Sequence, residues 1–85
     1  EDDVLERANA SETGLGSSVW TNDLERATRI ANQLQCGIVW VNSHFDVAPN
    51  APFGGHKQSG TGVEWGLTGL LGYCNSQTQW LKKKV

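Results

Sequence analysis

Residues 17–42 read SSVWTNDLERATRIANQLQCGIVWVN, and this stretch decides the fold class of the chain. The short apolar segment with Val19 and Trp20 predicts a strand over residues 17–21. Residues 38–41, IVWV, form a continuous apolar run, which is typical of a strand covered on both faces. Two such strands so close in sequence need a compact connection between them, and a helix is the usual one.

The segment between the two strands has the pattern of an amphipathic helix. Asn22 and Glu25 stand at capping-box spacing, so we expect the helix to begin there. Gly37 follows as the expected C-terminal cap. The apolar residues between these ends recur at steps of three and four: Leu24, Ala27, Ile30, Ala31 and Leu34. The whole stretch therefore predicts a βαβ unit of a parallel sheet, and the chain is placed in the α/β class.

The segments on either side of this unit are less regular. Residues 4–9 are weakly helical, and Gly14 and Gly16 are expected to stop that helix. Residues 42–61 contain both prolines and predict one long loop. Because this loop leaves the C-terminal end of the strand at 38–41, where open parallel sheets bind ligands, we expect it to be an active-site loop.

The C-terminal part predicts two further elements. Residues 62–74 have apolar residues at helical spacing and several interior glycines, so we expect a glycine-rich helix that depends on tertiary packing. Residues 76–83 alternate loosely and end in lysines, which fits an edge strand. We accordingly divide the chain into a main part, residues 1–75, and a C-terminal strand, residues 76–85.

Length and composition limit the classes of protein to consider. Eighty-five residues suit one small domain and exclude a second. A net charge of −2 and only three lysines in the tail argue against nucleic-acid binding. No apolar run approaches the length that spans a bilayer and no signal peptide is recognisable, so we expect a soluble cytoplasmic protein with no membrane partner. The four tryptophans, at 20, 40, 65 and 80, indicate burial against something large.

The most specific run in the chain is residues 52–66, PFGGHKQSGTGVEWG. Five glycines are not demanded by core packing alone, because each costs backbone entropy unless a positive φ or a close approach requires it. The run resembles the C-terminal signature of the aldehyde dehydrogenase superfamily, P-F-G-G-x-K-x-S-G-x-G-x-E-x-G, and matches every defined position. Residues 6–42 are similar to the preceding part of the family. Since the family's enzymes are several hundred residues long, the chain resembles only their C-terminal region. The resemblance implies that residues 1–75 are the C-terminal part of the catalytic domain and that residues 76–85 are an oligomerisation strand.

This resemblance implies a parent enzyme that oxidises an aldehyde to a carboxylic acid with NAD or NADP. The family's nucleophilic cysteine, oxyanion donor, general base and dinucleotide site come from segments that have no counterpart here. Neither Cys36 nor Cys74 matches the nucleophile, and both are expected to be reduced structural thiols. The isolated chain is therefore expected to bind no cofactor and to be inactive.

The resemblance also implies roles for individual residues. Phe53 matches a phenylalanine that helps to form the wall of the aldehyde tunnel, and Val47 and His44 fall where the family varies its substrate pocket. Glu64 matches a glutamate on a proton path toward the deacylation site, where a partly buried carboxyl with a raised pKa could relay a proton. The alternative for Glu64 is a residue that only stabilises a helix N-terminus through the macrodipole.

In some family members, backbone carbonyls that match Lys57 and Gly60 bind a potassium ion between subunits. Carbonyl oxygens are chemically suitable ligands for such a hard cation. The competing interpretation is a simple turn capped by Ser59. The histidines, His44 and His56, lack a third ligand and predict no metal site.

A rival hypothesis from another functional class is a non-enzymatic self-association module. The expected strand at 76–83 matches a family strand that adds to a sheet of a neighbouring subunit, so a homo-oligomer is the implied assembly. An orphaned βαβ unit rich in tryptophan would also favour self-association. The two ideas are compatible, because part of an enzyme can behave alone as an oligomerisation unit.

Overall fold

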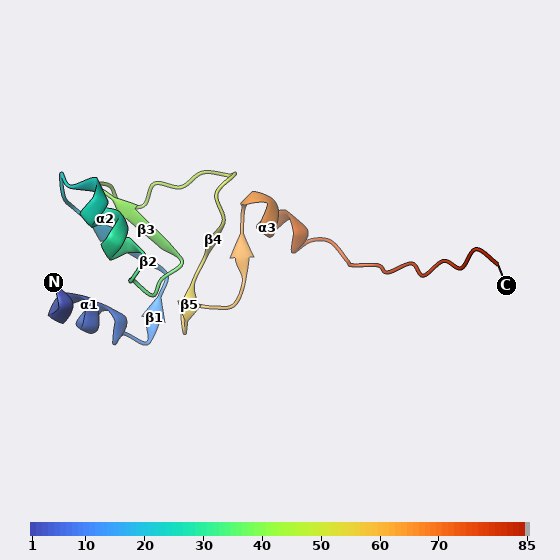
Figure 1. Cartoon of the computed structure of the whole chain (residues 1–85), viewed down its shortest axis with the longest axis horizontal. Helices are drawn as coiled ribbons and strands as arrows, with labels where there is room; N and C mark the ends of the chain where they lie inside the picture. The colour runs from blue at the N-terminus through green and yellow to red at the C-terminus, as the bar shows by residue number, and fades with distance from the viewer. Residues whose placement is uncertain (85) are drawn as a thin grey trace.

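A computed structural model describes residues 1–84, so Val85, the last residue of the predicted 76–85 strand, lies outside the described part. Figure 1 shows helices and strands gathered at the N-terminal side and a long tail leading to the C-terminus. The elements in chain order are α1 (Asp2–Asn9), β1 (Thr13–Gly14), β2 (Gly16–Val19), α2 (Leu24–Ala31), β3 (Ile38–Val41), β4 (Phe53–Gly54), β5 (His56–Lys57), β6 (Val63–Glu64) and α3 (Gly66–Leu71).

The central unit is the parallel pair β2–β3 with α2 as its connection. The two strands are in register from Gly16 opposite Ile38 to Val19 opposite Val41, which confirms the predicted strand, helix and strand. Trp40 is the buried residue of β3, at 7% exposure. A Cβ on Gly16 would lie 2.5 Å from the Trp40 ring, so glycine at this position leaves room for the indole across β2.

Both predicted ends of the central helix are wrong in detail. The N-cap is Asp23, not Asn22, and its carboxylate accepts a hydrogen bond from Arg26 N at 3.0 Å. The helix ends at Ala31 with Asn32 as its C-cap, several residues before Gly37. Gly37 therefore has another role, which its long-range contact explains.

Gly37 lies where two backbone segments meet. A Cβ at Gly37 would come within 1.5 Å of the carbonyl oxygen of Gly54. No side chain fits in that space, so the glycine is required by close approach and not by helix capping. The contact holds the start of the glycine-rich run against the N-terminal end of β3.

The segment 42–61 was predicted as one long loop, but it contains β4 and β5. It leaves the C-terminal end of β3 and returns to the opposite end of the sheet, where β5 pairs antiparallel with β1. Strand β4 pairs antiparallel with β6. Each of these pairs is only two residues long, so no alternation of side chains along the sequence could have predicted it.

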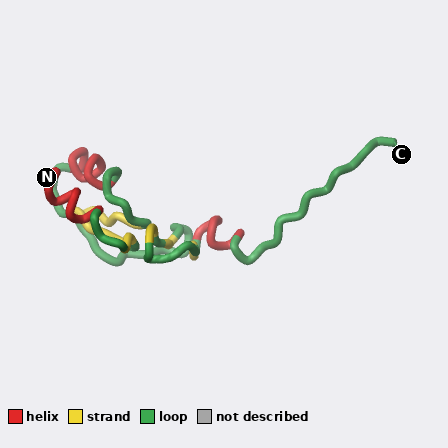
Figure 2. Tube along the Cα trace, turned by 90° about the horizontal axis from the view of Figure 1, so that it is seen from below, coloured by secondary structure: helices red, strands yellow, loops and turns green. Residues whose placement is uncertain are grey.

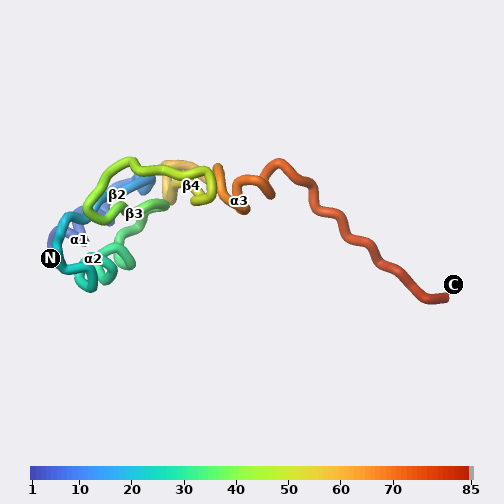
Figure 3. The backbone as a smooth tube through the Cα atoms, turned by 90° about the horizontal axis from the view of Figure 1, so that it is seen from above, coloured from blue at the N-terminus to red at the C-terminus, as the bar shows by residue number. Residues whose placement is uncertain are grey.

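The C-terminal elements are shorter than predicted. Val63 and Glu64 form β6, and α3 begins only at Gly66, after Trp65 turns the chain with a φ of 61°. Residues 76–83 form no strand in the single chain. Figures 2 and 3 show this tail running away from the remainder in both views. The radius of gyration of 18.1 Å exceeds the roughly 12 Å expected for a compact chain of this length.

The core is small. Within residues 1–84, the buried hydrophobic residues are Leu5, Ala27 and Trp40. Trp20 and Trp80 are 67% and 86% exposed, so the predicted burial of the tryptophans is met within the chain only by Trp40. No helix in this part of the chain has the length and apolar content needed to cross a bilayer.

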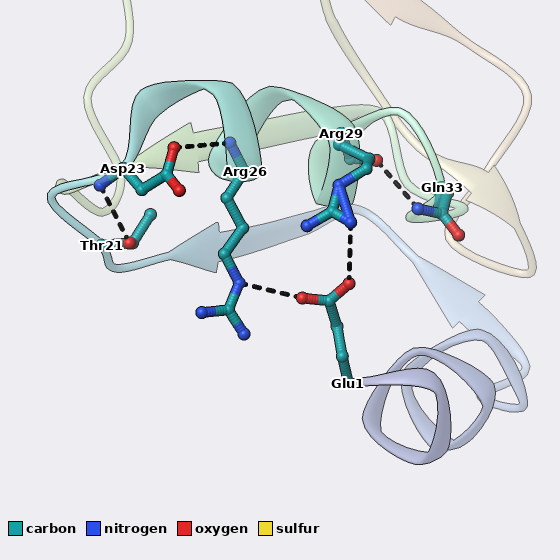
Figure 4. Close-up of polar contacts among 6 residues, drawn as sticks. All are labelled: Glu1, Thr21, Asp23, Arg26, Arg29 and Gln33. Atoms are coloured by element: carbon teal, nitrogen blue, oxygen red, sulfur yellow. Dashed lines mark hydrogen bonds and ion pairs between the residues drawn. The ribbon is translucent and has the colours of Figure 1, made fainter.

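An ion-pair cluster connects α1 to α2, as Figure 4 shows. The carboxylate of Glu1 accepts from Arg26 Nε at 2.9 Å and lies 3.3 Å from Arg29 Nη1. The hydrogen bond from Arg26 lowers the pKa of the Glu1 carboxyl, and the charge of Arg29 adds to this effect. These ion pairs hold the start of α1 beside α2.

We predict that Gly37→Ala lowers the free energy of unfolding by about 1–3 kcal/mol, because overpacking against a backbone carbonyl forces both segments to move. Gly62→Ala is the matched control, since a Cβ there would meet nothing within 4 Å. Urea unfolding followed by far-ultraviolet circular dichroism measures both variants. Equal midpoints for the two would contradict the Gly37 contact.

The Glu1 ion pairs predict a defined pH dependence. Because the folded-state pKa is lowered, the pairs stabilise the chain above the ordinary value of 4.5, and this stability is lost as the pH falls through the folded-state pKa. An NMR titration of the Glu1 carboxyl carbon should give a midpoint below 4.5. In Arg26→Ala the midpoint should move back up. A wild-type midpoint at or above 4.5 would refute the pairing.

Candidate functional site

An open groove of about 410 Å³ lies along the glycine-rich run. Its volume falls within the range of small-molecule sites. The groove is lined by residues from β4, β6 and the turns beside them: Leu15, Phe53, Gly54, Gly55, Ser59, Gly60, Gly62, Val63 and Glu64. Three of the predicted site residues, Phe53, Gly60 and Glu64, therefore share one concave surface.

Phe53 and Glu64 are direct neighbours in this groove. They face each other across the antiparallel pair of β4 and β6. The half-buried Phe53 ring packs against Trp65, with ring centroids 5.4 Å apart and a tilt of 53°. Trp65 was not predicted as a site residue, although an aromatic residue inside the signature could have indicated such a partner.

Glu64 lies outside the predicted helix. It belongs to β6 and precedes α3, so its assignment to a helix over 62–74 is wrong. Its side chain is exposed in the single chain. Within residues 1–84, its carboxylate has no ion-pair partner within 4.0 Å, and Asp3 and Glu1 are the acidic residues that have one.

His44 and Val47 lie in a different place, after the C-terminal end of β3. His44 Nδ1 is 2.7 Å from the hydroxyl of Ser18, and its ring meets Trp40 edge-on at 5.1 Å. The Trp40 indole also donates to the carbonyl of Asp46 at 2.7 Å, which fixes the start of the loop. The carboxyl end of the sheet thus carries His44 and Val47, but not Phe53, which the long-loop prediction placed there. Ser18 had no signal in the sequence that could have identified it.

Lys57 and Gly60 flank a tight turn in which both have positive φ, 55° and 132°. The Ser59 hydroxyl accepts from the backbone N–H of Gly14 at 2.8 Å, so it connects the turn to β1 and does not simply cap its own turn. Backbone carbonyls suit a hard cation chemically, but two donors are fewer than the six or more ligands that such cations usually take. A potassium ion here would need ligands from elsewhere, and its binding stays a prediction.

The two cysteines lie outside the groove. Both are free thiols, as predicted, and Cys36 Sγ lies 3.2 Å from the carbonyl of Ile38. In residues 1–84 no cluster of three or more His, Cys, Asp or Glu residues is arranged to hold a metal ion. The groove therefore offers an aromatic ring, backbone groups, the Ser59 hydroxyl and one carboxylate, but its lining includes no thiol.

Comparison with known proteins identifies the group to which this arrangement belongs. The family model for the aldehyde dehydrogenase family matches residues 1–79. The chain belongs to the aldehyde dehydrogenase family. This confirms the resemblance seen in the signature at residues 52–66.

Individual aldehyde dehydrogenases match over nearly all of the chain. The aldehyde dehydrogenase LUC3 of a Fusarium species is 46% identical over 82 residues, which cover 96% of this chain and 18% of that protein. Phenylacetaldehyde dehydrogenase of Pseudomonas fluorescens is 49% identical over 76 residues, covering 89% and 15%. The solved NAD⁺ complex of an aldehyde dehydrogenase from Bacillus cereus has a TM-score of 0.93 at 41% identity, covering 98% and 17%. The chain thus spans less than a fifth of the length of these relatives.

Proposed function

We propose that the chain is the C-terminal region of an NAD(P)-dependent aldehyde dehydrogenase that oxidises an aldehyde to a carboxylic acid. In this proposal it supplies part of the substrate-tunnel wall and contacts between subunits, and it is inactive alone. The observation that carries the proposal is the groove in which the signature residues Phe53, Gly60 and Glu64 meet. The similarity to the NAD⁺ complex of the Bacillus cereus enzyme supports NAD as the cofactor.

The division of chemical roles follows from the residues of the groove. Aldehyde oxidation needs a thiolate, an oxyanion donor, a hydride acceptor and a base for hydrolysis of the acyl-enzyme. When bound, a nicotinamide dinucleotide supplies the hydride acceptor. The groove residues fit neither a nucleophile nor a dinucleotide site, so we assign these functions to other parts of the parent enzyme. The Phe53 ring, which lines the groove and packs against Trp65, would provide apolar contact for the aldehyde.

Glu64 is the groove residue that can transfer a proton. It stands beside Phe53 and is exposed, so water can reach its carboxylate. We assign it to a proton relay that serves acyl-enzyme hydrolysis.

The tail supports the proposed subunit contacts. Trp80 and Leu81 are 86% and 85% exposed, and the segment is extended although it has no strand partner in the single chain. An extended segment with unpaired backbone groups can add to the edge of a sheet in another subunit. The same exposure favours the second candidate, self-association of the isolated chain without catalysis.

The proposed function predicts activity in a complete enzyme and none in the isolated chain. We would replace the matching C-terminal segment of the Bacillus cereus aldehyde dehydrogenase with residues 1–85, which align over 98% of this chain. This chimera should reduce NAD with an aliphatic or an arylacetaldehyde, and the 85-residue chain should give no turnover. A host lacking the segment is the negative control. Turnover by the isolated chain, or an inactive chimera that folds and binds NAD, would overturn the proposal.

Glu64→Gln in the same chimera tests the relay. Because glutamine keeps the shape but cannot carry a proton, kcat should fall by about tenfold or more and KM should fall with it, so that kcat/KM changes little. A burst of NADH before the steady state should appear, since hydrolysis of the acyl-enzyme becomes limiting. The matched control is Glu25→Gln on the exposed side of α2. If both variants keep the kcat of the parent chimera, Glu64 has no relay function.

A further inference from the structure

Lys57 makes contacts that no part of the proposed function uses. Its ammonium donates to the backbone carbonyls of Asn9 at 2.7 Å and Ser11 at 3.1 Å. These carbonyls belong to the last residue of α1 and to the segment just after it. Unpaired carbonyls and the negative end of the helix dipole both favour a cation at this position.

The backbone of Lys57 is in a conformation that a lysine adopts at a cost. Its φ of 55° lies in the left-handed region, which favours glycine. A side chain is retained at such a position when the surrounding contacts compensate for the strain. The two hydrogen bonds of the ammonium are contacts that a glycine could not make.

Residues next to Lys57 form further hydrogen bonds between the segment that follows α1 and the turn at residues 57–59. Thr13 pairs with Lys57 in the β1–β5 ladder, and Gln58 N donates to the carbonyl of Glu12 at 2.9 Å. Gly14 N donates to the hydroxyl of Ser59 at 2.8 Å. Residues 9–14 and 57–59 therefore form one hydrogen-bonded unit, which we call the Lys57 clasp.

The clasp also reaches the end of the βαβ connection. The side chain of Asn9 donates to the carbonyl of Gln33 at 2.8 Å and accepts from Gln35 N at 2.9 Å. The Asn9 carbonyl is at the same time the closer acceptor of the Lys57 ammonium. Lys57 is thus connected through Asn9 to the segment that leads from α2 into β3.

We propose that Lys57 is a positioning residue for the groove. Its ammonium holds the turn at 57–59 on the end of α1, and this turn carries Ser59 and Gly60, which line the groove beside Phe53 and Glu64. The clasp is a property of the chain itself, whereas its effect on aldehyde binding rests on the proposed function. Lys57 touches no groove ligand and acts through the position of the turn.

The test uses the Bacillus cereus chimera with Lys57→Met, Lys57→Arg and, as a control that also removes one exposed charge, Glu25→Gln on α2. Hydrogen exchange of the amides of Gly14, Gln58 and Ser59 reports on the clasp. Loss of two solvent-exposed charged hydrogen bonds should accelerate that exchange by about threefold to tenfold in K57M.

The KM for the aldehyde should rise by about threefold with kcat nearly unchanged, because reacting groups lie elsewhere. The guanidinium of K57R can donate to both carbonyls and should restore both values.

Lys57→Gly keeps the proposal testable if K57M does not fold. Glycine relieves the left-handed backbone but removes the ammonium, so it should stabilise the turn if Lys57 serves only the turn. The clasp predicts faster exchange in K57G despite that relief.

The outcomes separate the two proposals. Exchange in K57M or K57G equal to that in the Glu25→Gln control overturns the clasp. Faster exchange with an unchanged KM overturns the positioning role. Faster exchange in a chimera that is inactive in every form supports the clasp while the proposed function fails.

Discussion

The close backbone contact between Gly37 and Gly54 is the constraint on which the arrangement of the chain depends. One glycine ends the connection into β3 and the other belongs to the signature run, so two distant motifs require each other. A Cβ on Gly37 would overlap the carbonyl of Gly54, and the segments would have to separate. The groove lies along the far side of this junction and contains Gly54 in its wall. Its shape therefore depends on a contact in which no side chain takes part.

The small core explains why backbone contacts matter so much here. With Leu5, Ala27 and Trp40 as the buried hydrophobic residues in the described part of the chain, apolar burial supplies little stability. The glycine-rich run is held instead by short ladders, the Gly37 contact and the Lys57 clasp. Hydrogen bonds of this kind fix direction and distance, whereas apolar burial is non-directional. A groove built from such contacts can be well defined even though little of its wall is buried.

The sequence predicted those parts of the fold whose signals are local. The βαβ unit followed from apolar residues spaced along one helix and two strands, and the family followed from the signature. Gly37 was misread as a cap because a glycine after a helix usually is one, and its contact with Gly54 has no local signal. Glu64 was assigned to a helix because the spacing of Val63 and Leu67 continues across the turn at Trp65. The return of the loop to the N-terminal end of the sheet was also missed. Strand β5 exists because it pairs with β1, and the sequence of β5 alone carries no local signal for that pairing.

The two charged residues of the signature run, Lys57 and Glu64, differ in the contacts that they make. The ammonium of Lys57 has two backbone acceptors, so its charge is used within the chain to fix the turn. Glu64 lines the groove, and in residues 1–84 no cation lies within 4.0 Å of its carboxylate. Removing a charged group from water costs free energy unless the group is paired with an opposite charge. The Glu64 carboxylate is not engaged in an ion pair within the described part of the chain, which leaves it available for the proton transfer proposed for it.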